Sequence, residues 1–246
     1  MAKRLFDPTA TAPFALSRTK LHLFHECPRC FYLDRRLGIG RPSGPPFTLN
    51  EAVDQLLKRE FDLYRAVQKP HPLMTEAGID AIPAQRPELE KWRHNFTGVR
   101  HNHAPSGFEV FGAIDDLWID RVSGAYIVVD YKATAKEGEV GLDADWQISY
   151  KRQMETYQWL LRANGLPVSD TGYFVYCNGR KQAERFDANL AFKISVLPYT
   201  GKTDWVEPAL LDAAACLRGP LPPPTAECGW CRYLSAGGRL AEGSAP

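Results

Sequence analysis

The chain has 246 residues, of which 44% are hydrophobic, enough for one large core or a core with a small appendage. Thirty lysines and arginines balance 29 aspartates and glutamates, so the net charge is +1 and neither favours nor excludes a nucleic-acid partner. The sequence has no run of about 18 apolar residues, and it begins without the apolar segment of a secretory signal. These features predict a cytoplasmic protein with no membrane segment.

The first third of the chain predicts two helices. Residues 1–16 are expected to be flexible, and "LSRTKLHLFHE" then predicts a short amphipathic helix with Ser17 as its N-cap. After a loop rich in glycine and proline, residues 48–68 predict a longer helix, because apolar residues recur on one face. The members of this apolar stripe are Leu49, Val53, Leu56, Tyr64 and Val67.

The rest of the chain predicts four strands and two further helices. The stretches "FEVFGAIDDLWID" and "AYIVVDYKA" flank the turn "RVSG" and predict an antiparallel hairpin. A long amphipathic helix at about 145–164 precedes the strands "TGYFVYCNG" and "LAFKISVLPY", and another helix follows at about 204–217. We therefore expect an α/β fold in which a mixed central sheet is flanked by helices.

Charged residues lie on the two strands of the predicted hairpin. Successive residues of a strand point to opposite faces, so Asp115 is in phase with the apolar residues on the face predicted to be buried, and Asp116 falls on the other face. In the next strand Asp130 and Lys132 share one face. A buried carboxylate is costly unless a cation is near. Two carboxylates that converge with a lysine predict a site for Mg²⁺ or Mn²⁺, in which the lysine activates a water or stabilises developing charge.

The helix at about 145–164 carries an amide on its apolar face. Gln153 lies in the apolar stripe, and Tyr157, one turn later, offers a hydroxyl as its partner. A glutamine that bonds the backbone inside the core is the alternative. Because this helix follows the strand of Asp130 and Lys132, we expect Gln153 to belong to the same site.

Four of the six cysteines form two C-x-x-C pairs, which are Cys27, Cys30, Cys228 and Cys231. In a reducing cytosol such pairs are more typical of metal ligands than of disulfides. Four thiolates can hold either a 4Fe–4S cluster or a tetrahedral Zn²⁺, and either would join the two ends of the chain. Cys177 and Cys216 are predicted to be small buried hydrophobic residues.

The pieces "GAID" (112–115), "VVDYK" (128–132) and "QMETY" (153–157), in this order, resemble the PD-(D/E)XK nucleases. They resemble in particular the RecB-like branch, which includes the Cas4-like exonucleases. The terminal segments "LSRTKLHLFHECPRCFYL" and "CGWCRY" are also similar to that branch. The resemblance covers residues 17–234, implies a restriction-endonuclease-like core, and leaves residues 235–246 as a flexible tail.

The resemblance also implies a role for each site residue. By this resemblance Asp115 and Asp130 would be the metal ligands, and Lys132 would be the catalytic lysine. Gln153 and Tyr157 would support the site and the DNA. The implied activity is that of a Mg²⁺- or Mn²⁺-dependent deoxyribonuclease on single-stranded DNA or DNA ends, in DNA repair, recombination or CRISPR-type defence. The sequence has no G-x-x-x-x-G-K-S/T loop, so a helicase would be a separate chain, and CRISPR adaptation proteins are other expected partners.

The sequence departs from the family pattern at two places. The first helix of the family usually carries a metal-ligating histidine, where the stretch "NEAVDQLL" places Asp54. We expect Asp54 to complete the metal site with a carboxylate oxygen, and the alternative is a surface ion pair with Lys58 at i,i+4. Iron–sulfur members usually supply one N-terminal and three C-terminal cysteines, whereas this chain supplies two and two. The resemblance favours a 4Fe–4S cluster, and Zn²⁺ is the alternative.

Two other functions fit the same motifs. A catalytically inactive DNA-binding module of the same fold has no need of a costly carboxylate cluster, so the intact Asp115, Asp130 and Lys132 argue against it. The absence of the family's metal-ligating histidine keeps this inactive module as an alternative. An RNA-directed nuclease is the other alternative, because nothing in the sequence separates DNA from RNA.

Overall fold

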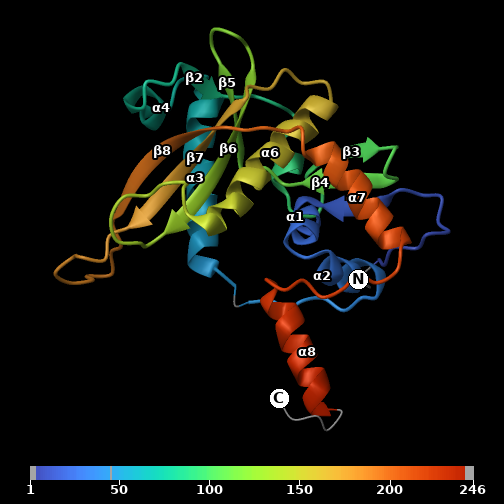
Figure 1. Ribbon diagram of the computed structural model, residues 1–246. Coiled ribbons are helices and arrows are strands. Elements are labelled where there is room, and N and C mark those ends of the chain that lie inside the picture. The colour runs from blue at the N-terminus through green and yellow to red at the C-terminus, as the bar shows by residue number, and fades with distance from the viewer. Residues whose placement is uncertain (1–3, 45, 242–246) are drawn as a thin grey trace. The chain divides into compact units, whose positions relative to one another are not determined.

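The computed structural model describes residues 4–44 and 46–241 of the chain (Figure 1). The chain divides into two compact units. The central unit takes residues 46–101 and 111–203, and the terminal unit takes its described residues from the ranges 1–45, 102–110 and 204–246. None of the helices within the described ranges is both long and apolar enough to cross a bilayer.

The central unit is built on a five-stranded mixed sheet. Its strands, in spatial order, are β2 (Ala81–Pro83), β5 (Asp116–Asp120), β6 (Tyr126–Thr134), β7 (Thr171–Gly179) and β8 (Phe192–Thr200). β6 and β7 run parallel, and the other neighbouring strands run antiparallel. The predicted hairpin is confirmed as the β5–β6 pair, in which Asp116 lies opposite Val129. The parallel pair requires a crossover connection, which contains a helix, as the sequence predicts.

Helices cover both faces of this sheet (Figure 1). The helices of the central unit are α3 (Thr48–Val67), α4 (Pro72–Glu76), α5 (Leu89–Arg93), the short 3₁₀ helix η1 (Asp145–Gln147) and α6 (Ile148–Ala163). α3 packs on the face of the sheet that carries Val129 and Tyr131. α6 lies on the opposite face, because its Gln153 bonds Asp130, and neighbouring residues of a strand alternate between faces. The predicted α/β architecture is confirmed.

The buried face of α3 differs from the predicted apolar stripe. Leu49 and Leu56, which belong to the predicted stripe, are each 61% exposed. The buried row consists instead of Leu57, Phe61 and Arg65, spaced one helical turn apart. Because this row ends in an arginine, the sequence pattern does not mark it as the buried face of the helix. The side chain faces inward because a buried carboxylate accepts its hydrogen bonds.

Close contact between α6 and the sheet depends on a glycine in β7. A Cβ atom at Gly172 would meet the sulfur of Met154 and the main-chain carbonyl oxygen of Val128. Met154 is fully buried at this point. The absence of a side chain at Gly172 therefore sets how closely the helix and the sheet approach each other.

The terminal unit is mainly helical. Its elements include β1 (Phe14–Ser17), α1 (Arg18–Glu26), α2 (Pro28–Arg36), α7 (Val206–Arg218) and α8 (Gly229–Ala241). Ser17 occupies the predicted N-cap position of α1, but its side chain makes no capping hydrogen bond. The helices α1, α2 and α7 contact one another, and α8 contacts α2. The segments before and after the central unit thus pack into a single helical cluster.

A second sheet was not predicted from the sequence. It contains three strands in the order β1–β4–β3, where β3 is Val99–His103 and β4 is Phe108–Gly112. The single strand predicted over "FEVFGAIDDLWID" is therefore wrong, because this stretch forms β4 and β5 in different sheets. The residues between them, 113–115, belong to no strand. This break places Asp115 in a bend rather than inside a strand.

The predicted flexible ends of the chain are described only in part. Residues 1–3 and 242–246, which belong to these ends, lie outside the described residues. Phe6 is buried, and its ring centroid lies 5.4 Å from that of Phe14 in an edge-to-face arrangement. The predicted limits of the nuclease domain, 17–234, stay a prediction.

Candidate functional site

The strand β6 brings Asp130 and Lys132 to one face of the sheet. Asp130 is fully buried, and its Oδ2 forms an ion pair with the Lys132 ammonium, whose side chain is 14% exposed. Burial lowers the pKa of Lys132, but Asp130 and then Asp115 outweigh this effect, so the pKa lies above its usual value. The two neighbouring carboxylates therefore keep the lysine charged.

Asp115 lies at the bend that precedes β5. One step beyond the last β5–β6 pair, which joins Asp116 and Val129, the register brings Asp115 opposite Asp130. The ladder does not continue there. The main-chain N–H of Tyr131 instead donates to Oδ2 of Asp115 at 3.0 Å. The carboxylate thus takes the place of a strand carbonyl and is held against β6 just beyond the end of the β5–β6 ladder.

The amide of Gln153 connects the acidic and basic groups of β6. Its Nε2 donates to Oδ1 of Asp130 at 2.7 Å and contacts the hydroxyl of Tyr157 at 3.2 Å. Its Oε1 accepts from the Lys132 ammonium at 3.4 Å. The same ammonium lies 4.5 Å from the ring centroid of Tyr150, a cation–π contact. Gln153 thus bonds groups of the predicted site rather than the core backbone.

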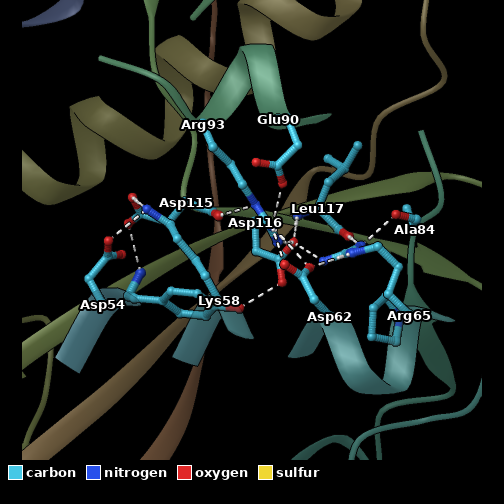
Figure 2. A network of polar contacts seen from close by, with 12 residues as sticks. Asp54, Lys58, Asp62, Arg65, Ala84, Glu90, Arg93, Asp115, Asp116 and Leu117 are labelled. Atoms are coloured by element: carbon cyan, nitrogen blue, oxygen red, sulfur yellow. Dashed lines mark hydrogen bonds and ion pairs between the residues drawn. The ribbon is translucent and has the colours of Figure 1, made fainter. Parts of the chain in front are cut away.

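Asp54 and Asp115 share an ion-pair partner, Lys58, which lies one helical turn after Asp54 on α3. The Lys58 ammonium lies 2.7 Å from Oδ2 of Asp54 and 3.5 Å from Oδ1 of Asp115 (Figure 2). The ion pair that was the alternative for Asp54 therefore exists, but it is half-buried and shared with Asp115. Burial and then the charge of Asp115 raise the pKa of Asp54. Sequence reasoning treated Lys58 as a surface partner and missed its contact with Asp115.

The residue after Asp115 is more buried than expected. The side chain of Asp116 is 0% exposed, whereas that of Asp115 is 22% exposed. The expectation that Asp115 carries the buried charge of this pair is therefore wrong. Both faces of the sheet are covered, so the face opposite the site is buried as well. On that face Asp116 accepts hydrogen bonds from Arg65, from Arg93 at 2.8 Å and from the Tyr131 hydroxyl at 2.6 Å.

The donor set of the site suits a hard cation. The contacts above form two sets: Lys58 with Asp54 and Asp115, and Lys132 with Asp130 and Gln153. Together the two sets hold three carboxylates, a carboxamide and two ammonium groups, with a formal net charge of −1 before any cation binds. Carboxylate oxygens are the ligands that Mg²⁺ and Mn²⁺ prefer. The site contains no thiol or imidazole among the side chains named above. Its chemistry therefore fits a divalent cation beside a charged lysine.

The four paired cysteines form a second cluster, in the terminal unit. Their sulfur atoms all lie within 4.8 Å of one another, and all four residues are buried, which confirms the predicted convergence of Cys27, Cys30, Cys228 and Cys231. Cys177 belongs instead to the apolar core of the central unit, and Cys216 lies on α7. Four thiols at this spacing fit one metal centre.

Polar groups around the cluster lower the pKa of one of its thiols, that of Cys27. Burial raises the pKa of the Cys27 thiol, but hydrogen bonds from the Thr225 hydroxyl and the Cys30 main-chain N–H outweigh it and bring the pKa to about 6. The guanidinium of Arg41 donates to Sγ of Cys228 at 3.5 Å. Burial dominates at Cys30 and raises the pKa of that thiol to about 12. A bound cation would bring all four thiols to the thiolate form.

Comparison with known families identifies the class of the protein. The family model of the PD-(D/E)XK nuclease superfamily matches residues 15–236. The chain belongs to the PD-(D/E)XK nuclease superfamily, whose members are generally nucleases that use a divalent metal. A search among curated proteins found no match.

Proposed function

We propose that the protein is a divalent-metal-dependent deoxyribonuclease of the RecB-like, Cas4-like branch, which hydrolyses phosphodiester bonds in single-stranded DNA or at DNA ends. The observation that carries the proposal is the contact set of Asp130, Lys132 and Gln153 on one face of β6, beside which Asp115 accepts from the main-chain N–H of Tyr131. Membership of a nuclease superfamily supports the same conclusion. By the resemblance we assign the activity to DNA repair, recombination or CRISPR-type defence in the cytoplasm, beside a separate helicase or adaptation proteins.

Asp115 and Asp130, with Asp54, are the residues that would hold the divalent cation. A cation bound there would act as a Lewis acid toward the phosphate and stabilise the negative charge that develops on it. The Lys132 ammonium would stabilise the same charge from a fixed direction, because Asp130 and Gln153 restrict its movement.

Gln153 and Tyr157 would act by holding the other groups. The Gln153 amide donates to Asp130 and accepts from Lys132, so one side chain sets the orientation of both. The Tyr157 hydroxyl contacts the same amide from the next turn of α6. Groups that are already oriented need little rearrangement when charge develops, which is the main source of electrostatic catalysis.

For the four-cysteine cluster we propose a 4Fe–4S centre, on the strength of the family resemblance. Protein purified anaerobically should be brown and contain iron and sulfide. Colourless protein with one bound zinc would replace the iron–sulfur assignment with a Zn²⁺ site and keep the metal connection between the chain ends. Protein that binds neither would remove the metal centre.

A nuclease assay tests the catalytic proposal. End-labelled single-stranded DNA, duplex DNA and RNA are incubated with the protein in Mg²⁺, Mn²⁺ or EDTA. We expect cleavage of single strands or ends in metal, and a loss of at least roughly a hundredfold in Asp130→Asn and Lys132→Met. The exposed Asp212→Asn on α7 is the control and should cleave like the native protein. Unchanged cleavage in Lys132→Met would refute the assigned site.

The same assay separates the two alternative functions. A catalytically inactive DNA-binding module would retain DNA in a filter-binding measurement but leave it intact in every metal tested. An RNA-directed nuclease would cut the labelled RNA and spare both DNA substrates. Either pattern, with the control variant behaving like the native protein, would replace the proposed function.

A further inference from the structure

A network of charged side chains surrounds the buried Asp116 (Figure 2). It lies on the face of the sheet opposite Lys132, because the side chain of Tyr131, the neighbour of Lys132 in β6, donates to Asp116. At its centre is Asp116, whose carboxylate is fully buried and accepts from two arginines and a tyrosine. Asp62 of α3 completes the network, because it accepts from Nε of Arg65 at 2.9 Å and from Nη1 of Arg93 at 2.9 Å. The two guanidinium groups thus contact the buried carboxylate of Asp116 and the more exposed carboxylates of Asp62 and Glu90.

Stability alone does not account for this network. A buried set of ion pairs can often be replaced by well-packed hydrophobic residues with no loss of stability, because the charges must be removed from water. The surroundings are apolar, since Phe61 and Trp118 pack in the same core. Hydrophobic residues in place of the whole set, Asp116 with its two arginines, would fit this environment, whereas loss of Asp116 alone would leave two buried guanidinium groups without their carboxylate. The network therefore calls for a role other than stabilisation of the fold.

Two residues of the network also hold Asp115. Nη2 of Arg93 donates to the Asp116 carboxylate at 2.8 Å, and Nε of the same side chain donates to the main-chain oxygen of Asp115 at 3.1 Å. Likewise, the Tyr131 hydroxyl donates to Asp116 at 2.6 Å, and its main-chain N–H donates to the Asp115 carboxylate at 3.0 Å. Both contacts with Asp115 therefore come from side chains or backbone that Asp116 fixes.

We propose that Asp116, Arg65 and Arg93 are positioning residues that fix the direction of the Asp115 carboxylate toward the divalent cation. Asp115 lies in a bend outside the β5–β6 ladder, so strand pairing does not orient it. The network fixes the bend from the opposite face. The inference deepens the proposed function and rests on it through the assignment of Asp115 as a ligand.

Arg93→Lys tests this role, because it keeps the charge but replaces the guanidinium fork by a single ammonium. An ammonium cannot reach Asp62, Asp116 and the Asp115 carbonyl together. Binding of Mn²⁺ is measured by electron paramagnetic resonance of the free ion, on protein whose cysteine centre is loaded. We expect affinity to fall roughly ten- to a hundredfold, as for the partners of other metal ligands. Asp115→Asn defines the signal from this site.

Met74→Ala is the matched control. Met74 is fully buried in the core that packs on the same face of the sheet, so its truncation lowers stability without touching the network. This variant should melt at a lower temperature and bind Mn²⁺ like the native protein. Equal loss of Mn²⁺ affinity in Met74→Ala and Arg93→Lys would refute a positioning role, because it would show that general destabilisation is sufficient.

Tyr131→Phe keeps the inference testable if Arg93→Lys does not fold. It removes only the hydroxyl bonded to Asp116 and leaves the main-chain contact to Asp115 in place. A loss of Mn²⁺ affinity in this variant, smaller than the loss expected for Arg93→Lys, supports the inference, and native affinity overturns it. The proposed function fails separately: native protein that binds Mn²⁺ through Asp115 but cuts no nucleic acid would retain the positioning network and lose the nuclease assignment.

Discussion

The ion pair between Asp130 and Lys132 yields a prediction that separates stability from activity. Lys132→Met removes the ammonium and leaves the Asp130 carboxylate buried without its cation. Breaking a buried pair in this way costs about 3–5 kcal/mol. For a domain of this size each kcal/mol lowers the melting temperature by roughly 2–4 °C, so a decrease of roughly 6–20 °C is expected. Cleavage should be lost as well.

The double variant Asp130→Leu with Lys132→Met removes both charges at once. Replacing a buried pair by hydrophobic residues of similar volume is often neutral or stabilising, so most of the lost stability should return. Cleavage should stay absent, because neither a ligand nor the ammonium remains. Melting curves and the labelled-DNA assay on the native protein, the single variant and the double variant check both expectations. A double variant as unstable as Lys132→Met, or one that still cuts DNA, would refute the reasoning.

Further predictions concern the metal centres and the packing of the sheet. Cys228→Ser should lose the metal bound by the cysteine cluster, measured by elemental analysis, whereas Cys177→Ser should keep it; equal metal content in both would contradict the cluster. Lys58→Met should bind Mn²⁺ roughly tenfold more tightly, because a cation that competes for two carboxylates at less than 4 Å is removed. Unchanged affinity would show that Lys58 is electrostatically neutral to the site. Gly172→Ala should lower stability by about 1–3 kcal/mol in denaturant unfolding, because its Cβ would overlap Met154, and native stability would show that the helix can shift.

The local elements of the fold could be predicted because their signals are short-range. The strand β7 occupies the stretch "TGYFVYCNG" residue for residue, and α1 begins directly after the predicted cap Ser17. The break between β4 and β5 could not be predicted in the same way. Apolar residues continue through Ala113 and Ile114, and only the pairing of each half with a different sheet shows where the strand ends. Pairing partners are a property of the whole fold.

The candidate site shows a similar division. Asp130 and Lys132 could be placed on one face by their spacing, and the four paired cysteines by their repeated motif. Arg65 and Lys58 could not be found, because each is a charged residue on a helix that elsewhere is exposed to solvent. Their importance comes from partners about fifty positions away in the chain, Asp116 and Asp115. A charge is recognisable as functional only when its partner is known.

The cysteine cluster also has a consequence for the order in which the protein is assembled. Cys30 and Cys228, whose sulfur atoms lie 3.6 Å apart, are separated by 198 positions in the sequence. At ribosomal rates of about 5–20 residues per second, the N-terminal pair waits about 10–40 s for the C-terminal pair to be synthesised. During that interval the thiols of Cys27 and Cys30 lack the other two ligands of the centre, so they can be oxidised or can bind a different metal ion. The helix α8, which carries Cys231 and follows the other described elements in the chain, completes the centre, so metal content would distinguish chains that reached α8 from those on which translation stopped earlier.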